Sequence, residues 1–356
     1  MKKFLALFLV LALMLPCMLA ASAEGEKIAL ITDVGTIDDE SFNQACWLAV
    51  EAYAKANNIE YTYYQPAADN NDERLMKLDQ AVSEGATVIV MPGYMFGATL
   101  YMAQEDYPDV HFIAVDVGAG DLTPDYVNYS EPAAHVACVT FSEEQAGYLA
   151  GYAAVKDGYT KLGFLGGTAV PAVIRYGYGF VQGADKAAAE LGIQVEINYT
   201  YGGQFYGTPE TTAKMEGWYS AGTQIVFACG GGIYTSAVEA AHKYDGKVIG
   251  VDVDQYYIDE CIVTSAMKGL QNVTETILTE YYAGNWDTYG GKVTNYSLLE
   301  GEYVGLPTAE GSWRFDSFTL ADYIVIHDAV KEGTVVVSND VENAPVVTNS
   351  TVYYIQ

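Results

Sequence analysis

Residues 28–44 have the sequence IALITDVGTIDDESFNQ, in which a short apolar run leads into a polar, glycine-containing turn and then into a helical pattern. This order predicts a buried strand over 28–32 with a loop at its carboxyl end. In an open parallel α/β sheet, ligands bind beyond the carboxyl ends of the strands, where loop side chains converge. The stretch therefore predicts a doubly wound fold with a ligand site at Asp33, Phe42 and Asn43.

The chemistry of these side chains suits a flat ligand rich in nitrogen and oxygen. The phenylalanine ring offers a face for stacking, while Asp33 and Asn43 offer hydrogen-bond acceptors and an amide donor. A nucleobase or nucleoside is such a ligand. The stretch also has a purely structural interpretation, in which Asp38, Asp39 and Ser41 cap the helix that follows. The two interpretations are compatible.

Short apolar runs alternate with amphipathic helical stretches from residue 28 to about 250, which is typical of repeated βα units and a parallel sheet. Strands are expected over 28–32, 60–64, 87–91, 110–115, 161–166, 194–199, 224–228 and 247–251, with weaker strand patterns near 293–297, 303–306 and 351–355. Helices are expected over 41–57, 72–84, 97–105, 143–156, 172–191, 209–221, 233–243 and 319–332.

Two sets of these units follow one another, one before about residue 141 and one after it. They predict two doubly wound parallel-sheet lobes that are joined by a hinge and hold the ligand in the cleft between them. We assign residues 24–140 and about 263–290 to the first lobe, and residues 141–262 and about 291–356 to the second.

The first residues have the pattern of an export signal. A basic start, an apolar run and the small residues Ala21-Ser22-Ala23 predict a signal peptide over 1–23. Cleavage after Ala23 is favoured over lipid attachment at Cys17, because Pro16 precedes the cysteine. No later apolar run reaches the roughly 20 residues needed to cross a bilayer. We expect an exported, extracytoplasmic protein, at the cell surface or in the periplasm, with a lipid anchor at Cys17 as the alternative.

The chain is strongly acidic, with 17 Lys and Arg against 46 Asp and Glu and a formal net charge of −29. Such a field repels nucleic acid and anionic membranes, and it favours a neutral or cationic small ligand. The later cysteines contain no CxxC pair and the four histidines no metal-spaced pair, so we expect neither a disulfide framework nor a metal or cofactor.

A second informative segment is VIGVDVDQ at 248–255, followed by VTSAMK at 263–268. Asp252 ends a strand, and its carboxylate can accept two hydrogen bonds from a vicinal diol such as that of ribose. Lys268 either takes part in the site, where it binds the same sugar or holds Asp252 ionised, or is a solvated lysine at a helix start. Gly230 lies in a triple-glycine turn, where the backbone can approach a ligand closely or simply connect a strand to a helix.

The segments DESFN at 39–43 and GVDVDQ at 250–255 together resemble the basic membrane protein family, and the similarity spans nearly the whole mature chain. Members of that family are substrate-binding lipoproteins of ABC transporters with the type I periplasmic-binding fold, and they include purine nucleoside receptors. The resemblance implies a monomeric nucleoside-binding protein that works with the permease subunits of an importer and catalyses no reaction.

In the nucleoside receptors of that family, two aromatic rings enclose the base, an aspartate and an asparagine contact its edge, and an aspartate and a lysine hold the ribose. The matching positions imply Phe42 as one ring, Asp33 and Asn43 at the base edge, and Asp252 with Lys268 at the ribose.

The second ring is less sharply defined, because the spacing of residues 201–206 departs from the pattern of the family. The resemblance favours Phe205, with Tyr206 as the alternative. Tyr94 and Asp254 follow expected strand ends and are further candidates for the same cleft.

Three other functions compete with this interpretation. A sugar receptor of the same architecture would place hydroxyl groups on the aspartates and a sugar ring on the aromatics. A sensory receptor would pass its ligand-bound form to a membrane signalling partner. Residues 32–39 partly resemble the calcium-binding aspartates of nucleoside hydrolases, but Ile31 and Val34 stand where an aspartate and a proline are needed. We therefore expect no enzyme activity.

Overall fold

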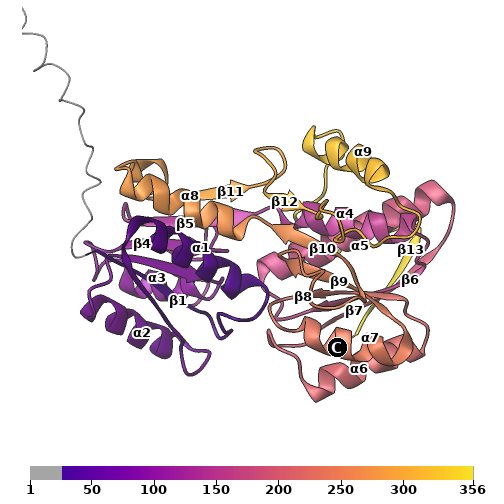
Figure 1. Cartoon of the computed structure of the whole chain (residues 1–356), viewed down its shortest axis with the longest axis horizontal. Helices are drawn as coiled ribbons and strands as arrows, with labels where there is room; N and C mark the ends of the chain where they lie inside the picture. Colours follow the sequence, from indigo (N-terminus) through magenta and orange to yellow (C-terminus); the bar gives the residue numbers. More distant parts are fainter. Residues whose placement is uncertain (1–25, 356) are drawn as a thin grey trace, which may run out of the picture.

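The computed structural model describes residues 26–355, which form two α/β lobes lying side by side (Figure 1). The predicted fold class, two lobes built on parallel sheets, is confirmed. The expected signal peptide and Cys17 lie outside the described residues. Within 26–355, no helix combines the length and the apolar character needed to span a membrane.

The first lobe is a six-stranded parallel sheet in the order β11-β5-β4-β3-β1-β2 with helices on both faces. Its strands are β1 (Lys27–Ile31), β2 (Glu60–Tyr64), β3 (Val88–Pro92), β4 (His111–Val115), β5 (Val136–Phe141) and β11 (Lys292–Tyr296). Its helices are α1 (Phe42–Asn57), α2 (Asn71–Ser83), α3 (Phe96–Ala103), α8 (Leu270–Tyr282) and the short η1 (Trp286–Thr288). Alternate residues of β1 lie on opposite faces of the sheet. Ile28 and Leu30 pack in one core cluster, and Ala29 and Ile31 pack in the other.

The second lobe is a seven-stranded sheet in the order β12-β10-β9-β8-β6-β7-β13. Its strands are β6 (Lys161–Gly166), β7 (Val195–Tyr201), β8 (Ile225–Cys229), β9 (Lys247–Asp252), β10 (Ile262–Lys268), β12 (Val304–Gly305) and β13 (Ser350–Tyr354). Its helices are α4 (Glu143–Lys156), α5 (Pro171–Leu191), α6 (Pro209–Ser220), α7 (Tyr234–Tyr244) and α9 (Leu320–Lys331). Only β12 runs antiparallel to its neighbour in this sheet.

The pairing of two strands corrects the expected lobe boundaries. β10 pairs with β9 in the second sheet, although its residues were assigned to the first lobe. β11 pairs with β5 in the first sheet, although its residues were assigned to the second lobe. The chain therefore crosses between the lobes three times, after β5, after β10 and after β11. The strands expected up to residue 251 all form, whereas β5, β10 and α8 were not predicted.

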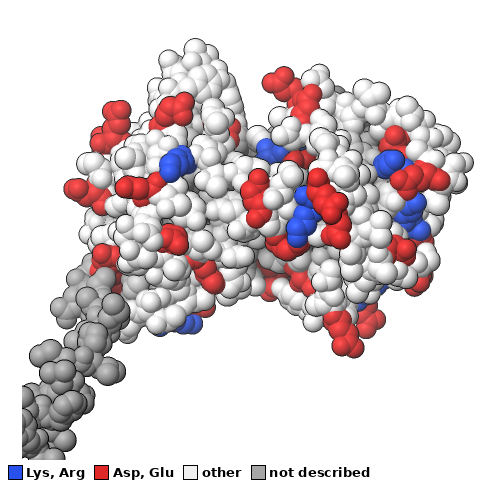
Figure 2. All heavy atoms as spheres, turned by 90° about the horizontal axis from the view of Figure 1, so that it is seen from above, with Lys and Arg blue, Asp and Glu red and all other residues white. Residues whose placement is uncertain are grey.

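The surface carries the acidic excess that the composition predicts. Figure 2 shows aspartates and glutamates spread over both lobes on the displayed face, with few basic side chains among them. This distribution favours solubility and specifies no partner by itself.

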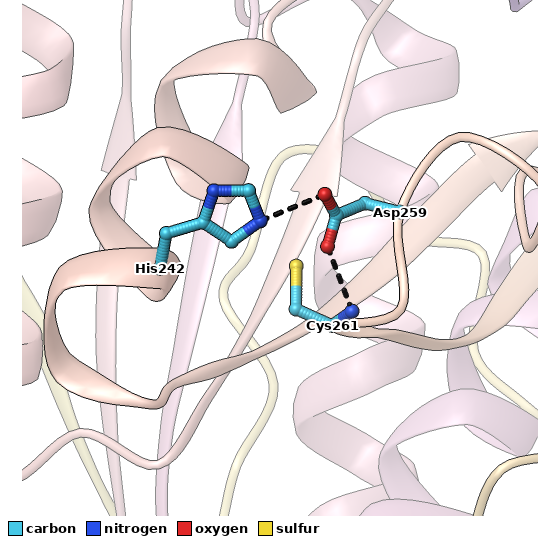
Figure 3. A group of neighbouring side chains, drawn as sticks. All are labelled: His242, Asp259 and Cys261. Atoms are coloured by element: carbon cyan, nitrogen blue, oxygen red, sulfur yellow. Dashed lines mark hydrogen bonds and ion pairs between the residues drawn. The ribbon is translucent and has the colours of Figure 1, made fainter.

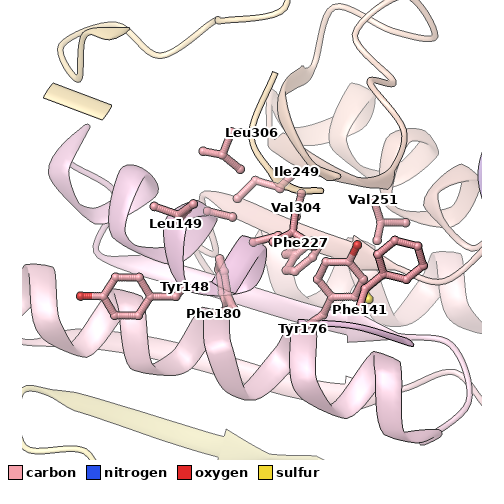
Figure 4. Packing of buried hydrophobic residues seen from close by; sticks show 14 of the residues in the cluster. Phe141, Tyr148, Leu149, Tyr176, Phe180, Phe227, Ile249, Val251, Val304 and Leu306 are labelled. Carbon is pink, nitrogen blue, oxygen red and sulfur yellow. The ribbon is translucent and has the colours of Figure 1, made fainter. Parts of the chain in front are cut away.

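Glycines bring α4 and α5 into backbone contact. A Cβ atom at Gly147 would overlap the carbonyl oxygen of Tyr176, and one at Gly151 would overlap that of Phe180. Beside this crossing, the rings of Tyr176 and Phe180 reach Phe227 of β8, with ring centroids 5.8 and 5.5 Å away (Figure 4). The close crossing thereby fixes where the aromatic core of the second lobe lies.

We predict that Gly147→Ala destabilises the protein by about 1–3 kcal/mol, because the added methyl group forces the two helices apart. Gly217→Ala in α6 is the matched control, since no atom of the described residues lies within 4 Å of its Cβ position. There alanine should raise stability by roughly 0.5–1 kcal/mol through its higher helix propensity. Urea unfolding measures both changes, and equal effects of the two substitutions would contradict the packing argument.

Candidate functional site

A cavity lies between the carboxyl ends of the two sheets, where a doubly wound fold places its ligands. The first lobe contributes Asp33, Gly35, Asp39, Phe42, Asn43, Gly93, Tyr94, Met95 and Asp116 to its wall. The second lobe contributes Val170, Ala172, Val173, Tyr176, Phe205, Cys229, Gly230, Gly231, Val251, Asp252 and Lys268. Both lobes are therefore needed to enclose a molecule in this space.

One group of polar side chains follows β1 and begins α1. The Asn43 amide donates hydrogen bonds to Asp33 Oδ1 at 3.0 Å and to Asp39 Oδ2 at 3.2 Å. Asp39 also accepts from the backbone N–H groups of Ser41, Asn43 and Gln44, at 2.9 to 3.1 Å. Asp39 therefore caps α1, while the Ser41 side chain makes no cap hydrogen bond. The amide of Asn43 holds the two carboxylates in place.

Asp33 has a carboxylate oxygen that remains available as a hydrogen-bond acceptor. Its Oδ1 accepts from Gly35 N at 2.6 Å and from Asn43, whereas no described residue donates to its Oδ2. Burial raises the pKa of the Asp33 carboxyl to about 6. The side chain thus offers the cavity an acceptor at neutral pH and a donor under mildly acidic conditions.

Two phenylalanines face the cavity from opposite lobes. Phe42 comes from the first turn of α1, and Phe205 from the loop after β7; both are half-buried. A Cβ atom at Gly167 or Gly230 would overlap the Phe205 ring, and Gly230 has a φ of 138°. Glycine at these positions therefore leaves space for the ring, and Gly230 also brings its own backbone to the cavity wall.

A second polar group surrounds Lys268 at the end of β10. Its side chain is 2 % exposed, and its Nζ lies 2.5 Å from Asp116 Oδ2, 3.1 Å from Glu143 Oε1 and 4.0 Å from Asp252 Oδ1. Lys268 was considered as a solvated lysine at a helix start, and its burial at the end of a strand excludes that interpretation. Arg175 Nε donates to the other oxygen of Glu143 at 2.6 Å.

The charges of this group do not balance among themselves. Three carboxylates face two cations, and burial raises the pKa of Asp252 to about 6 and also raises that of Asp116. Asp116 Oδ1 is buried without a hydrogen-bond partner among residues 26–355. Asp116 and Asp252 have φ values of 61° and 67°, a left-handed conformation that aspartate tolerates. The group is therefore short of hydrogen-bond donors.

Direct hydrogen bonds connect the lobes around the cavity. Ser41 Oγ donates to Asp252 Oδ2 at 2.6 Å, and Gln255 Nε2 donates to the carbonyl oxygen of Glu40 at 2.8 Å. The Lys268 to Asp116 ion pair is a third connection. The lobes are closed on one another in this arrangement.

The structure brings most of the candidate residues around this one cavity. Those that line it are Asp33, Phe42, Asn43, Tyr94, Phe205, Gly230, Asp252 and Lys268. Tyr206 and Asp254 do not line it. Tyr206 is 59 % exposed, and Asp254 accepts a hydrogen bond from Ser312 Oγ at 2.5 Å.

Several residues of the site were not named as ligand-binding candidates from the sequence, among them Asp116, Glu143, Arg175 and Tyr176. Asp116 had a usable signal, since Val-Asp-Val occurs both at 115–117 and at 251–253, each time after a buried strand. The others lie on helices whose approach to β10 is set by tertiary packing, and their neighbourhood contains no such repeat.

Comparison with known proteins identifies the family. Residues 26–335 match the model of the Bmp family, described as "ABC transporter substrate-binding protein PnrA-like". The chain belongs to this family. It is thus a substrate-binding protein of the ABC transporter type, as the sequence resemblance indicated.

Relatives and solved structures agree with this assignment. The chain is 26% identical to the "ABC transporter nucleoside-binding protein BmpA" of Lactococcus lactis over 298 residues, covering 77% of this chain and 80% of the relative. It is 29% identical to basic membrane protein B of Borreliella burgdorferi over 295 residues, covering 81% and 83%. A solute-binding protein of an ABC transporter system from Aeropyrum pernix shares the fold, with a TM-score of 0.70, 20% identity and 88% of each chain covered.

We predict that Asp33→Asn stabilises the ligand-free protein at neutral pH, by about 3 kcal/mol. The raised pKa means that the folded chain binds a proton more tightly than the unfolded chain does between pH 3.8 and about 6. The wild-type protein therefore loses stability as the pH rises through this window, and asparagine removes that loss. Urea unfolding from pH 4 to pH 8 measures the difference. A difference in the free energy of unfolding between the two proteins that stays constant from pH 4 to pH 8 would contradict the raised pKa of Asp33.

Proposed function

We propose that this protein binds a nucleoside, with a purine preferred, in the cavity between its lobes. The observation that carries the proposal is one cavity lined by Phe42 and Phe205 from opposite lobes, together with the two polar groups around Asp33 and Lys268. Aromatic faces, an acceptor at a base edge and carboxylates for hydroxyl groups are the contacts that a nucleoside requires.

The shortage of hydrogen-bond donors around Lys268 supports a ribose in that part of the cavity. A vicinal diol supplies two O–H donors, and the unpartnered Asp116 Oδ1 and the carboxylate of Asp252 are acceptors for them. Donors from a ligand would relieve the desolvation penalty that these buried oxygens carry. The name of the lactococcal relative, a nucleoside-binding protein, points to the same class of ligand.

The remaining parts of the proposal concern transport. The closed protein would deliver its ligand to the permease subunits of an ABC importer on the extracytoplasmic side of the membrane, as a monomer and without a cofactor or catalysis. Lipid attachment at Cys17 would keep it near the permease, and cleavage after Ala23 would release it.

Isothermal titration of the ligand-stripped mature protein tests the proposal. The ligands are adenosine, guanosine, inosine, uridine, cytidine and free ribose. We expect purine nucleosides to bind and free ribose to give no signal. Binding of ribose or other sugars alone would favour the sugar receptor, and silence toward every nucleoside would overturn the proposal.

We predict that Phe205→Ala weakens nucleoside binding by about 1–3 kcal/mol, because a stacking face is lost. Tyr206→Ala is the matched control, since the neighbouring tyrosine is exposed and lies outside the cavity lining. Its affinity should equal that of the wild-type protein in the same titration. If Tyr206→Ala weakened nucleoside binding and Phe205→Ala did not, Tyr206 would be the second aromatic ring that stacks on the base.

We also predict that Asp252→Asn weakens ribonucleosides about 10- to 100-fold, the range expected when a hydrogen bond to a charged group is lost. The corresponding 2′,3′-dideoxynucleosides lack the diol, so their weaker binding should change little. Competition titration measures both ligand series on the same variant. Equal weakening of the two series would remove the role of Asp252 at the diol.

A further inference from the structure

A second cluster of ligand-type side chains lies on the second lobe, apart from the cavity. His242 is in the last turn of α7, while Asp259 and Cys261 are in the loop that leads into β10. A ligand atom from each of the three lies within 4.8 Å of the others. None of the three lines the cavity, and they are at the amino ends of β9 and β10, opposite the carboxyl ends that face it.

The geometry of the cluster is well defined (Figure 3). His242 Nε2 is 2.7 Å from Asp259 Oδ2, and Cys261 N donates to Asp259 Oδ1 at 2.9 Å. The sulfur of Cys261 points toward the carboxylate and the imidazole. The backbone hydrogen bond fixes the carboxylate relative to the sulfur, so two of the three groups are held in place by the same loop.

An imidazole, a thiolate and a carboxylate together form a donor set that suits zinc. Zn²⁺ binds these groups at about 2.0–2.3 Å in a tetrahedron, so that the donor atoms are about 3.5 Å apart. The sulfur favours Zn²⁺ over Mg²⁺ or Ca²⁺, which prefer oxygen ligands. The side chain of His242 is 59 % exposed, so the imidazole has the freedom to turn toward a shared metal position.

We propose that His242, Asp259 and Cys261 bind Zn²⁺, with water in the fourth position. Three protein ligands and one open position form a complete tetrahedral set. Cys261 is buried and His242 is exposed, so solvent reaches the cluster mainly at the histidine. The site is independent of the nucleoside cavity.

The thiol gives this site a measurable signature. A metal ion binds the thiolate and not the thiol. An ordinary cysteine is mostly protonated at neutral pH, so the Cys261 thiol must lose its proton when it becomes a metal ligand. Zinc binding should release a proton to the buffer, and the affinity should rise with pH.

The test is a titration of the full mature protein, without nucleoside, first with Co²⁺ and then with Zn²⁺. We expect one equivalent of Co²⁺ to produce the near-ultraviolet charge-transfer band of a thiolate ligand, and Zn²⁺ to abolish it. Calorimetry in two buffers of different ionisation enthalpy measures the proton release. Cys261→Ser should lose the band, and His242→Ala should lose high-affinity binding.

His327→Ala is the matched control. This histidine also contacts carboxylates, those of Glu302 and Asp328, but no cysteine among residues 26–355 completes a cluster around it. The control should bind Zn²⁺ as the wild-type protein does. Absence of the band from the wild-type protein, its persistence in Cys261→Ser, or its loss in His327→Ala would each overturn the proposal. Thermal unfolding of metal-free Cys261→Ser and wild type establishes that the variant is folded.

Discussion

The buried ammonium of Lys268 is the interaction on which the arrangement of the two lobes depends. It lies at the end of β10 in the second lobe, yet one of its partners, Asp116, ends β4 in the first lobe. Loss of this charge would leave three buried carboxylates with Arg175 as the nearest cation, an arrangement that typically costs several kcal/mol. The ion pair thus connects lobe closure with the composition of the cavity wall.

The first loop combines a structural role with a place in the site. Asp39 accepts three backbone hydrogen bonds at the start of α1, and the same carboxylate holds the Asn43 amide that orients Asp33. The capping and ligand interpretations of residues 28–44 are therefore two aspects of one hydrogen-bond network. Because the cap positions the site, a change in the helix start also changes the cavity.

The sequence predicted those parts of the fold that depend on local patterns. Apolar runs bounded by polar turns are sufficient to locate β1, β3, β4, β6, β8 and β9, since these strands are almost fully buried. β2 and β7 are partly exposed, and they are rich in residues that favour strands. β10 was missed because Thr264 and Ser265 interrupt its apolar run, although both are fully buried. The surroundings of Lys268 were equally hidden, because its partner Asp116 is far away in the sequence and only the fold brings the two together.

The candidate site likewise combines residues that local sequence patterns predict with residues that only the fold brings together. Asp33, Phe42 and Asn43 belong to one short stretch that a strand and a helix start position locally, and all three line the cavity. Asp254 was placed by its nearness to a strand end, and Tyr206 was the alternative to Phe205 for the second aromatic ring that the family resemblance implies. Of these two neighbouring aromatic residues, Phe205 lines the cavity and Tyr206 is exposed to solvent. Zinc-type ligands were not foreseen, because His242 and Cys261 belong to different elements and become neighbours only in the folded lobe.

The three crossings between the lobes also determine how the molecule folds. The edge strand β11 pairs with β5, joining Lys292 to Ala137, so the first sheet is incomplete until almost 300 residues are available. The second sheet likewise receives β13 from the end of the described chain. Neither lobe is a continuous piece of polypeptide, and both require long-range closure of the chain. The two lobes should therefore unfold in a single cooperative transition, even though each has its own sheet.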